Sequence, residues 1–319
     1  MDRKPVFSFI IVILIALLSL TACAQQPSET DEDDPSMWAG IRASSYGLRE
    51  SFGRFPKVSE LTDYVGKMES CYEDSTGTCL LIVGIIGDDN STCYLDFPLS
   101  KEIGHAIGEE KDLYESYLTA MDKAGYSVWL QVEPGDADIV ELATEVMNHY
   151  KHHRCVKGFG IDVEWFKASD NPGRGTPLDK ATARKVLTAV RKIKENYTVF
   201  IKHWVAEYLT GGEPLEGFIY VDDSQGFRGG KDYTALERMC DEFADWAETF
   251  NPCPVMFQIG YDDEDAKRSD KVNIWGSMTN PAKDLGTAII TECGKRDRTN
   301  TLGIIWVDFT LKEAIEKIK

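Results

Sequence analysis

The sequence has few basic residues for its length. Its 319 residues include 35 Lys and Arg against 53 Asp and Glu, which gives a formal net charge of −18. A surface this acidic repels phosphate groups, so the composition argues against a nucleic-acid partner and against binding to anionic membranes through the protein surface. The charge does not identify a substrate.

Several metal and nucleotide signatures are also absent. The chain has no CxxC or HExxH pattern, and its adjacent histidines, His152 and His153, fall in a polar turn. No GxGxxG or GxxxxGK[ST] segment opens a helix, so the common nucleotide-binding folds are not indicated. We therefore expect neither a metal nor a cofactor.

A long apolar run occurs at the N-terminus. Arg3 and Lys4 precede the run 7–20, which is shorter than the ~20 residues of a spanning helix and is typical of a secretory signal. The run leads into Leu-Thr-Ala-Cys at 20–23, which resembles the lipobox of bacterial lipoproteins. This resemblance implies cleavage before Cys23, a lipid on Cys23, and an exported protein anchored on the cell surface or in the periplasm. An ordinary signal peptide or an N-terminal membrane helix is the alternative.

Three segments follow from this pattern. Residues 1–22 form the signal, 23–36 an acidic tether too polar to fold, and 37–319 one folded domain. Export permits disulfides, and Cys71 with Cys79 and Cys240 with Cys253 are the most plausible local pairs, although spacing alone does not fix pairing.

Short β-rich runs alternate with amphipathic helical stretches through the folded domain. This order predicts βα units and a parallel sheet, and eight such units predict a single (β/α)8 barrel. The expected strands are Trp38–Ala43, Leu80–Ile86, Ser127–Val132, Val156–Val163, Thr198–Trp204, Gly217–Val221, Val255–Ile259 and Leu302–Val307. The expected helices are Ser59–Ser70, Glu110–Ala124, Ala137–Tyr150, Asp179–Glu195, Tyr233–Phe250, Pro281–Cys293 and Leu311–Lys319.

The connections differ in length on the two sides of this predicted barrel. Those from a strand into the next helix are long, and those from a helix into the next strand are short. Active sites of such barrels lie at the carboxyl ends of the strands, on the side of the long loops. The stretch between Trp204 and Gly217 is short, so the helix there is expected to be reduced to a turn.

The fourth strand carries two carboxylates at its end. Strand alternation places Gly158, Gly160, Asp162 and Glu164 on one side, facing the barrel interior. Two acids this close do not ionise independently, so one pKa is raised, and a raised acid beside a second carboxylate is typical of a glycosidase. The alternative is a structural carboxylate bonded to backbone or to Arg42.

Other predicted strand ends carry polar and aromatic side chains that suit a sugar. Aromatic faces stack on sugar rings, while carboxylates and amides bond hydroxyl groups. Trp165, Trp204 and Trp306 are the stacking candidates, and each could equally be a core residue. The further candidates for substrate binding are Gln131, His203, Tyr220, Asp223, Gln258, Tyr261 and Asp308.

Strand four resembles the family 18 chitinase signature DxxDxDxE. Asp162-Val163-Glu164 matches its last Asp-x-Glu, whereas Gly160 and Lys157 stand where the family has its other two aspartates. The segments 223–226 and 303–306 are similar to the family's sixth and eighth strands, and strand three departs from the pattern. The resemblance implies that Glu164 is the proton donor and that Asp162 orients a substrate N-acetyl group.

These observations together indicate a retaining glycoside hydrolase of a polysaccharide, acting as a monomer. A second mechanism keeps Glu164 as the acid and uses Glu133 or Asp222 as nucleophile, about 5–5.5 Å away. The alternative from another class is a non-catalytic, carbohydrate-binding barrel.

Overall fold

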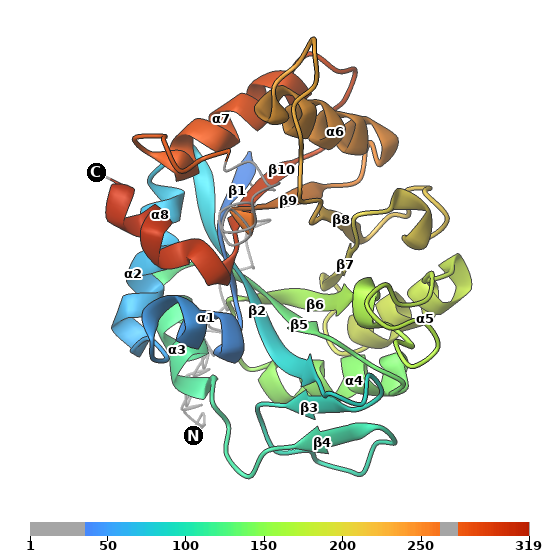
Figure 1. Cartoon of the computed structure of the whole chain (residues 1–319). Coiled ribbons are helices and arrows are strands. Elements are labelled where there is room, and N and C mark those ends of the chain that lie inside the picture. The colour runs from blue at the N-terminus through green and yellow to red at the C-terminus, as the bar shows by residue number, and fades with distance from the viewer. Residues whose placement is uncertain (1–35, 262–273, 319) are drawn as a thin grey trace, which may run out of the picture. The chain divides into compact units, whose positions relative to one another are not determined.

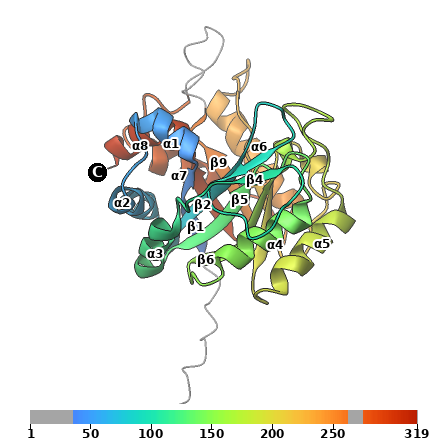
Figure 2. The ribbon, with the colours of Figure 1, turned by 90° about the horizontal axis from the view of Figure 1, so that it is seen from below.

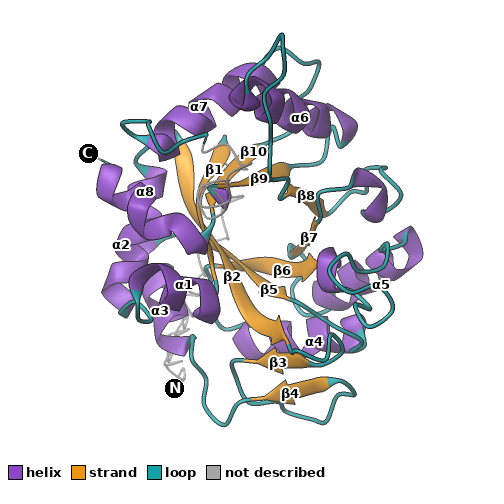
Figure 3. Ribbon diagram, in the orientation of Figure 1, coloured by secondary structure: helices purple, strands orange, loops and turns teal. Residues whose placement is uncertain are grey.

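The computed structural model describes residues 36–261 and 274–318, which belong to the compact unit Pro35–Lys319. Eight parallel strands of this unit close into a barrel with helices around it (Figures 1 and 3). The barrel closes where β1 (Met37–Ala43) pairs with both β2 (Ser75–Ile86) and β10 (Leu302–Trp306). The predicted (β/α)8 fold is confirmed. Cys23 and its lipobox lie outside the described residues.

The remaining barrel strands follow one another in chain order. From β2 they are β5 (Ser127–Val132), β6 (Val156–Asp162), β7 (Thr198–Lys202), β8 (Phe218–Asp222) and β9 (Val255–Ile259), which pairs with β10. Each corresponds to a predicted strand. The largest difference in bounds is at β2, whose first residues (Ser-Thr-Gly) lack the apolar pattern on which the prediction depended.

The helices surround the strands. They are α1 (Ser45–Phe52), α2 (Val58–Glu69), α3 (Glu115–Ala124), α4 (Ile139–Tyr150), α5 (Lys180–Arg191), α6 (Ala235–Thr249), α7 (Pro281–Cys293) and α8 (Leu311–Lys317). Seen from below, α1, α2, α3 and α8 lie on one side of the strands and α4, α5 and α6 on the other (Figure 2). Among the described residues, no helix is both long and apolar enough to cross a membrane.

Polar caps explain where several of these helices begin. Asp138 accepts hydrogen bonds from two N–H groups in the first turn of α4, and Asp179 does the same for α5. Thr234 and Glu237 cap α6 reciprocally. These bonds satisfy N–H groups that have no partner inside the helix. Between β7 and β8 the described chain forms only the short 3₁₀ turn Ala206–Tyr208, as predicted.

Three sequence-based expectations are corrected. The long connection after β2 is not irregular, because it carries β3 (Cys93–Leu95) and β4 (Ala106–Gly108), which extend the sheet beyond β2 (Figure 3). Helix α1 was not predicted, since its eight residues hold few apolar positions. The seven cysteines after Cys23 are all buried and free, so neither proposed disulfide is present.

The barrel interior has an apolar layer below a polar one. The apolar layer is a buried cluster separate from the core between strands and helices, and it comprises Trp38, Leu80, Trp129, Phe200, Ile219, Val221, Met256 and Ile305. On β6, Phe159 and Ile161 belong to the outer core, so the predicted alternation is confirmed as far as Asp162. Val163 and Glu164, which were expected to continue it, lie in the 3₁₀ turn Val163–Trp165 that follows the strand. The polar layer lies at the carboxyl ends of the strands.

Candidate active site

Lys202 is the central cation of the polar layer at the mouth of the barrel. Its Nζ lies 3.0 Å from Asp162 Oδ2 and 2.5 Å from Asp223 Oδ2, and all three side chains are at most 4% exposed. A buried ammonium is stable only when it is paired. The two carboxylates raise the pKa of Lys202 well above its usual value, against the opposing effect of its burial. Lys202 therefore carries its charge and holds two carboxylates in place.

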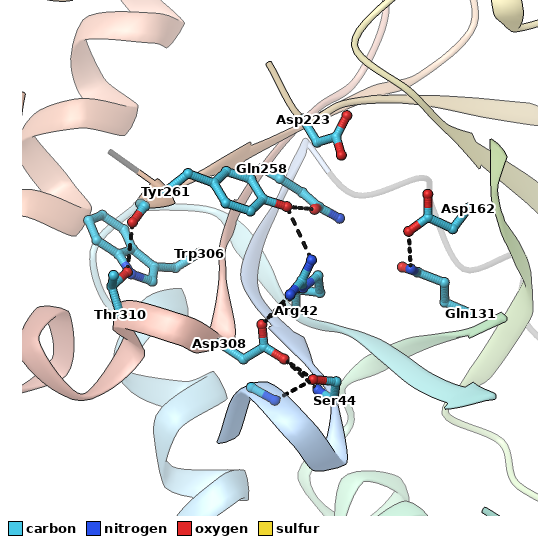
Figure 4. Close-up of polar contacts among 12 residues, drawn as sticks. Arg42, Ser44, Gln131, Asp162, Asp223, Gln258, Tyr261, Trp306, Asp308 and Thr310 are labelled. Carbon is cyan, nitrogen blue, oxygen red and sulfur yellow. Dashed lines mark hydrogen bonds and ion pairs between the residues drawn. The ribbon is translucent and has the colours of Figure 1, made fainter. Parts of the chain in front are cut away.

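Asp162 receives a further bond from the neighbouring strand. Gln131 Nε2 donates to Asp162 Oδ2 over 3.1 Å, as Figure 4 shows. Burial raises the pKa of Asp162, and the charge of Lys202 opposes that rise. Lys202 and Gln131 together fix the orientation of this carboxylate in the barrel mouth.

Gly160 leaves room for an aromatic ring below Asp162. A Cβ at this position would lie 2.2 Å from two carbons of the Phe200 ring. The space that a side chain at position 160 would need is therefore filled by Phe200. One of the side chains that contact Asp162 here is a cation, Lys202.

Glu164 lies just after β6, in the short 3₁₀ turn Val163–Trp165. It is half-buried. Burial raises its pKa to about 8; Lys202 opposes the rise, while Asp162 and Asp223 add to it. At neutral pH the Glu164 carboxyl therefore holds a proton that it can donate. This is the protonation state required of a general acid.

Glu133 is the fourth carboxyl group at the mouth, after Asp162, Asp223 and Glu164. Its Oε2 accepts a hydrogen bond from the Ile86 N–H over 3.0 Å. Burial, followed by the charge of Asp162, raises its pKa to about 7, and the Ile86 bond opposes the rise. Glu133 is thus a weaker base and nucleophile near pH 6 than an ordinary carboxylate.

A second ion pair lies across the mouth from Asp162. Arg42 Nη2 lies 2.6 Å from Asp308 Oδ1, and Ser44 donates to Asp308 Oδ2 through both its N–H and its hydroxyl. Arg42 also donates to the Tyr261 hydroxyl, which donates to Gln258 Oε1 over 2.8 Å (Figure 4). Asp308 is therefore fully engaged by the protein, whereas Gln258 and Tyr261 belong to the polar network of the mouth.

Four buried polar atoms in this layer have no hydrogen-bond partner among the described residues. They are Gln131 Oε1, Asp162 Oδ1, Asp223 Oδ1 and Gln258 Nε2. In Figure 4 these four side chains point into the same space from different strands. Because buried polar groups are normally bonded, this convergence indicates a site for a polar ligand.

A pocket of about 600 Å³ opens beside Glu164. Two aromatic rings, Trp204 and the 46% exposed Tyr233, are part of its lining. The other lining residues come from the loop after β8 and from α6, and they are Ser224, Gln225, Gly226, Phe227, Arg228, Arg238 and Glu242. The pocket thus combines a protonated acid with aromatic faces and polar groups.

Five residues expected in the site lie elsewhere. Tyr220 and Asp222 alternate with the interior residues of β8, and Tyr220 stacks on Phe250 of the outer core. Trp306 is 1% exposed and donates to Thr310, behind Tyr261 in Figure 4. His203 is a structural residue, and Trp165, half-buried, does not line the pocket.

His203 is held by backbone and aromatic contacts. It stacks between Trp204 and Tyr208, with ring centroids 4.2 and 4.3 Å away. Its Nδ1 accepts from the Val205 N–H, which leaves Nε2–H to donate to the Arg174 carbonyl. Burial lowers its pKa to about 4, so His203 is neutral and supports Trp204 from behind.

Sequence reasoning missed Lys202 and most of the pocket. Lys202 could have been found from strand alternation, since it lies two residues after Phe200 on the interior face of β7. The pocket residues Arg238 and Glu242 lie on a helix face that only the fold brings to the mouth.

Comparisons with known proteins give likeness of fold only. No protein-family model matches the sequence, and neither does any curated protein. Among solved structures, the β-glucuronidase of Parabacteroides merdae is 11% identical, with 86% of this chain and 31% of that chain covered and a TM-score of 0.45. A glycoside hydrolase family 5 protein of Bacteroides vulgatus is 9% identical, with 86% and 59% covered and a TM-score of 0.48.

The catalytic domain of the major endoglucanase of Xanthomonas campestris pv. campestris is 11% identical, with 89% of this chain and 94% of that chain covered and a TM-score of 0.43. The chain spans about a third of the length of the β-glucuronidases that it matches. TM-scores below 0.5 do not establish a common activity, and none is inferred from them.

Proposed function

We propose that this protein is a glycoside hydrolase in which Glu164 is the general acid. The observation that carries the proposal is the raised pKa of Glu164, about 8, on a carboxyl that lines the pocket beside Trp204. A protonated acid at the edge of an aromatic-lined pocket can deliver its proton to a glycosidic oxygen, while a sugar ring stacks on the indole.

Asp162 is the second member of the proposed mechanism. It is the last residue of β6, and Glu164 follows two residues later in a 3₁₀ turn, too close along the chain for the two carboxylates to flank opposite faces of a sugar ring. Its buried Oδ1 has no partner among the described residues and can accept the N–H of a substrate acetamido group. This arrangement favours substrate assistance, a known exception to the two-carboxylate scheme.

The proposed reaction then has two steps. Glu164 gives its proton to the leaving oxygen while the acetamido carbonyl oxygen attacks the anomeric carbon and the glycosidic bond breaks. Glu164, now a carboxylate, takes a proton from water, and that water opens the cyclic intermediate at the anomeric carbon. Asp162 stabilises the positive charge on the acetamido nitrogen, and Lys202 keeps Asp162 oriented. The configuration at the anomeric carbon is retained.

The mechanism with Glu133 as nucleophile is less well supported. A nucleophile must be ionised while the acid is protonated, and pKa values of about 7 for Glu133 and about 8 for Glu164 confine that combination to a narrow pH range. Asp222, the other residue considered for this role, belongs to the outer face of β8.

The experiment compares Glu164→Gln with Glu242→Gln, a change in the same pocket. On β-linked N-acetylglucosamine oligosaccharides, Glu164→Gln should lower kcat by about 10²–10⁴-fold and keep the affinity for the oligosaccharide. Glu242→Gln should retain turnover. Glucose counterparts should not be cleaved.

Other results would change the proposal in defined ways. Unchanged turnover in Glu164→Gln would remove Glu164 from the mechanism. Equal cleavage of glucose substrates would exclude assistance by the N-acetyl group. If the wild type binds glycans without cleaving them, the protein is a carbohydrate-binding barrel and not a glycosidase.

A further inference from the structure

A second cluster of chemically active side chains lies away from the barrel mouth. His152 and His153 follow the C-terminal end of α4, in the turn that leads into β6. Glu115, the first residue of α3, contacts both of them across 37 and 38 residues of sequence. The turn enters β6 at its N-terminal end, so the cluster belongs to the face of the barrel opposite the pocket.

The spacing of the three side chains matches a metal site. Glu115 carboxylate oxygens lie 3.1 and 3.2 Å from His152 Nε2 and 3.3 Å from His153 Nε2. The three ligand atoms all fall within 4.8 Å of one another. In a tetrahedral zinc site with bonds of about 2.0–2.2 Å, neighbouring ligand atoms are separated by about 3.3–3.5 Å.

A neighbouring carboxylate fixes the orientation of His153. Asp122 Oδ2 lies 2.7 Å from His153 Nδ1, and Asp122 Oδ1 accepts the Cys155 N–H over 2.7 Å. When Nδ1–H donates to Asp122, the lone pair of Nε2 points toward Glu115. Carboxylate–histidine pairs of this kind orient histidine ligands in zinc proteins.

His153 thus lies between two carboxylates. Its Nε2 and the carboxylate of Glu115 are 3.3 Å apart, and a metal ion bound to both would take the place of a proton between them. His153 is 3% exposed, so water does not solvate it freely. The carboxylates of Glu115 and Asp122 supply negative charge around the imidazoles, which suits a divalent cation.

We propose that Glu115, His152 and His153 bind one divalent transition-metal ion of the zinc type, with Asp122 as the positioning residue. Imidazole and carboxylate ligands suit this class of metal. The site joins α3 to the turn between α4 and β6, so its role is to stabilise the fold. The sequence does not predict it, because the histidines and Glu115 are brought together only by helix packing.

The test is a titration of the tag-free full chain with Zn²⁺ by calorimetry, together with thermal unfolding. The wild type should bind one Zn²⁺ at this site, and its melting temperature should rise with Zn²⁺ concentration. His152→Gln alters a residue that is about half exposed, so the variant should fold, bind at least tenfold more weakly and lose the rise. Asp122→Asn should weaken binding about 10–100-fold.

His105→Asn is the matched control. His105 is exposed and has a positive φ of 59°, which asparagine tolerates, so this variant should bind Zn²⁺ like the wild type. The proposal is overturned if the wild type binds no Zn²⁺, if His152→Gln binds with unchanged affinity, or if His105→Asn loses binding. Cleavage of glycans is not needed for this readout, so failure here leaves the proposed glycosidase intact.

Discussion

At the scale of single residues, the protonation state of Glu164 determines what the proposed enzyme can do. Its pKa is raised to about 8, mainly by burial. Burial also raises the pKa of Asp162, and Lys202 opposes the rise at both groups. Only Asp162 is in direct contact with Lys202, at 3.0 Å, which suits Asp162 as the orienting group and Glu164 as the proton donor.

The pH dependence of turnover follows from this separation. Turnover should fall as the pH rises through about 8, where Glu164 loses its proton, and should also fall in acid, where Asp162 gains one. The measurement is kcat against pH on an N-acetylglucosamine oligosaccharide. A profile that stays flat between pH 7 and pH 10 would exclude Glu164 as the acid.

A substitution of Lys202 tests the buried cluster that it forms with Asp162 and Asp223. Lys202→Met leaves Asp162 and Asp223 buried without their cation, so the free energy of unfolding at pH 7 should fall by about 3–5 kcal/mol. The loss should be smaller at low pH, where both carboxyls can take up protons. Denaturant unfolding at two pH values measures it.

Lys180→Met is the comparison for Lys202→Met. Lys180 pairs with Glu213 at the surface, with side chains 34% and 70% exposed. Removing this pair should change the free energy of unfolding far less, because solvent and salt screen an exposed ion pair. Equal losses in the two variants would contradict the structural role given to Lys202.

At the scale of elements, the interior face of β6 carries two glycines and then Asp162 at the carboxyl end of the strand. Gly158 and Gly160 admit close neighbours. A Cβ at Gly158 would lie 2.0 Å from the Thr198 carbonyl oxygen of β7 and 3.0 Å from the Trp129 ring, and one at Gly160 would overlap Phe200. The apolar layer formed by these rings closes the barrel below the carboxylates. Because β6 has no side chains at its two glycines, the Trp129 and Phe200 rings fill the space below the site.

Gly160→Ala tests this packing. The added methyl group must displace the buried Phe200 ring, so the free energy of unfolding should fall by about 1–3 kcal/mol. Gly104→Ala is the control, since a Cβ there meets no atom within 4 Å. Thermal or denaturant unfolding of both variants measures the difference, and an unaffected Gly160→Ala would show that the Phe200 ring relaxes freely.

At the scale of the whole molecule, the barrel brings long loops and strand ends to one mouth. The pocket draws on residues after β6, β7 and β8 and on α6. The N-terminal segment concerns the location of the protein in the cell. We propose that Cys23 anchors the protein to a membrane, with the acidic tether between the lipid and the barrel.

Cys23→Ser tests the anchor. The wild type should partition with membranes and carry a lipid, because the thiol at position 23 is the acceptor that the lipobox resemblance implies. The variant should stay unprocessed and carry no lipid, which fractionation and mass spectrometry can detect. Wild-type protein free in the medium and cut at another bond would contradict this assignment.

The sequence by itself determined the fold and one face of the site. Alternation along a strand is a local property, so the eight strands and the inward direction of Gln131 and Asp162 could be predicted. Gln258 was found in the same way.

Only the tertiary structure decided which polar side chains of the described residues keep an atom without a hydrogen-bond partner. Asp308, His203 and Trp306 are engaged by Arg42, by backbone groups and by Thr310, and these partners are distant in sequence or depend on the exact path of a loop. The tertiary structure also placed Lys202 between two aspartates of different strands and Glu115 beside two histidines. Such contacts depend on strand register and helix packing across the barrel, which a local pattern of residues does not specify.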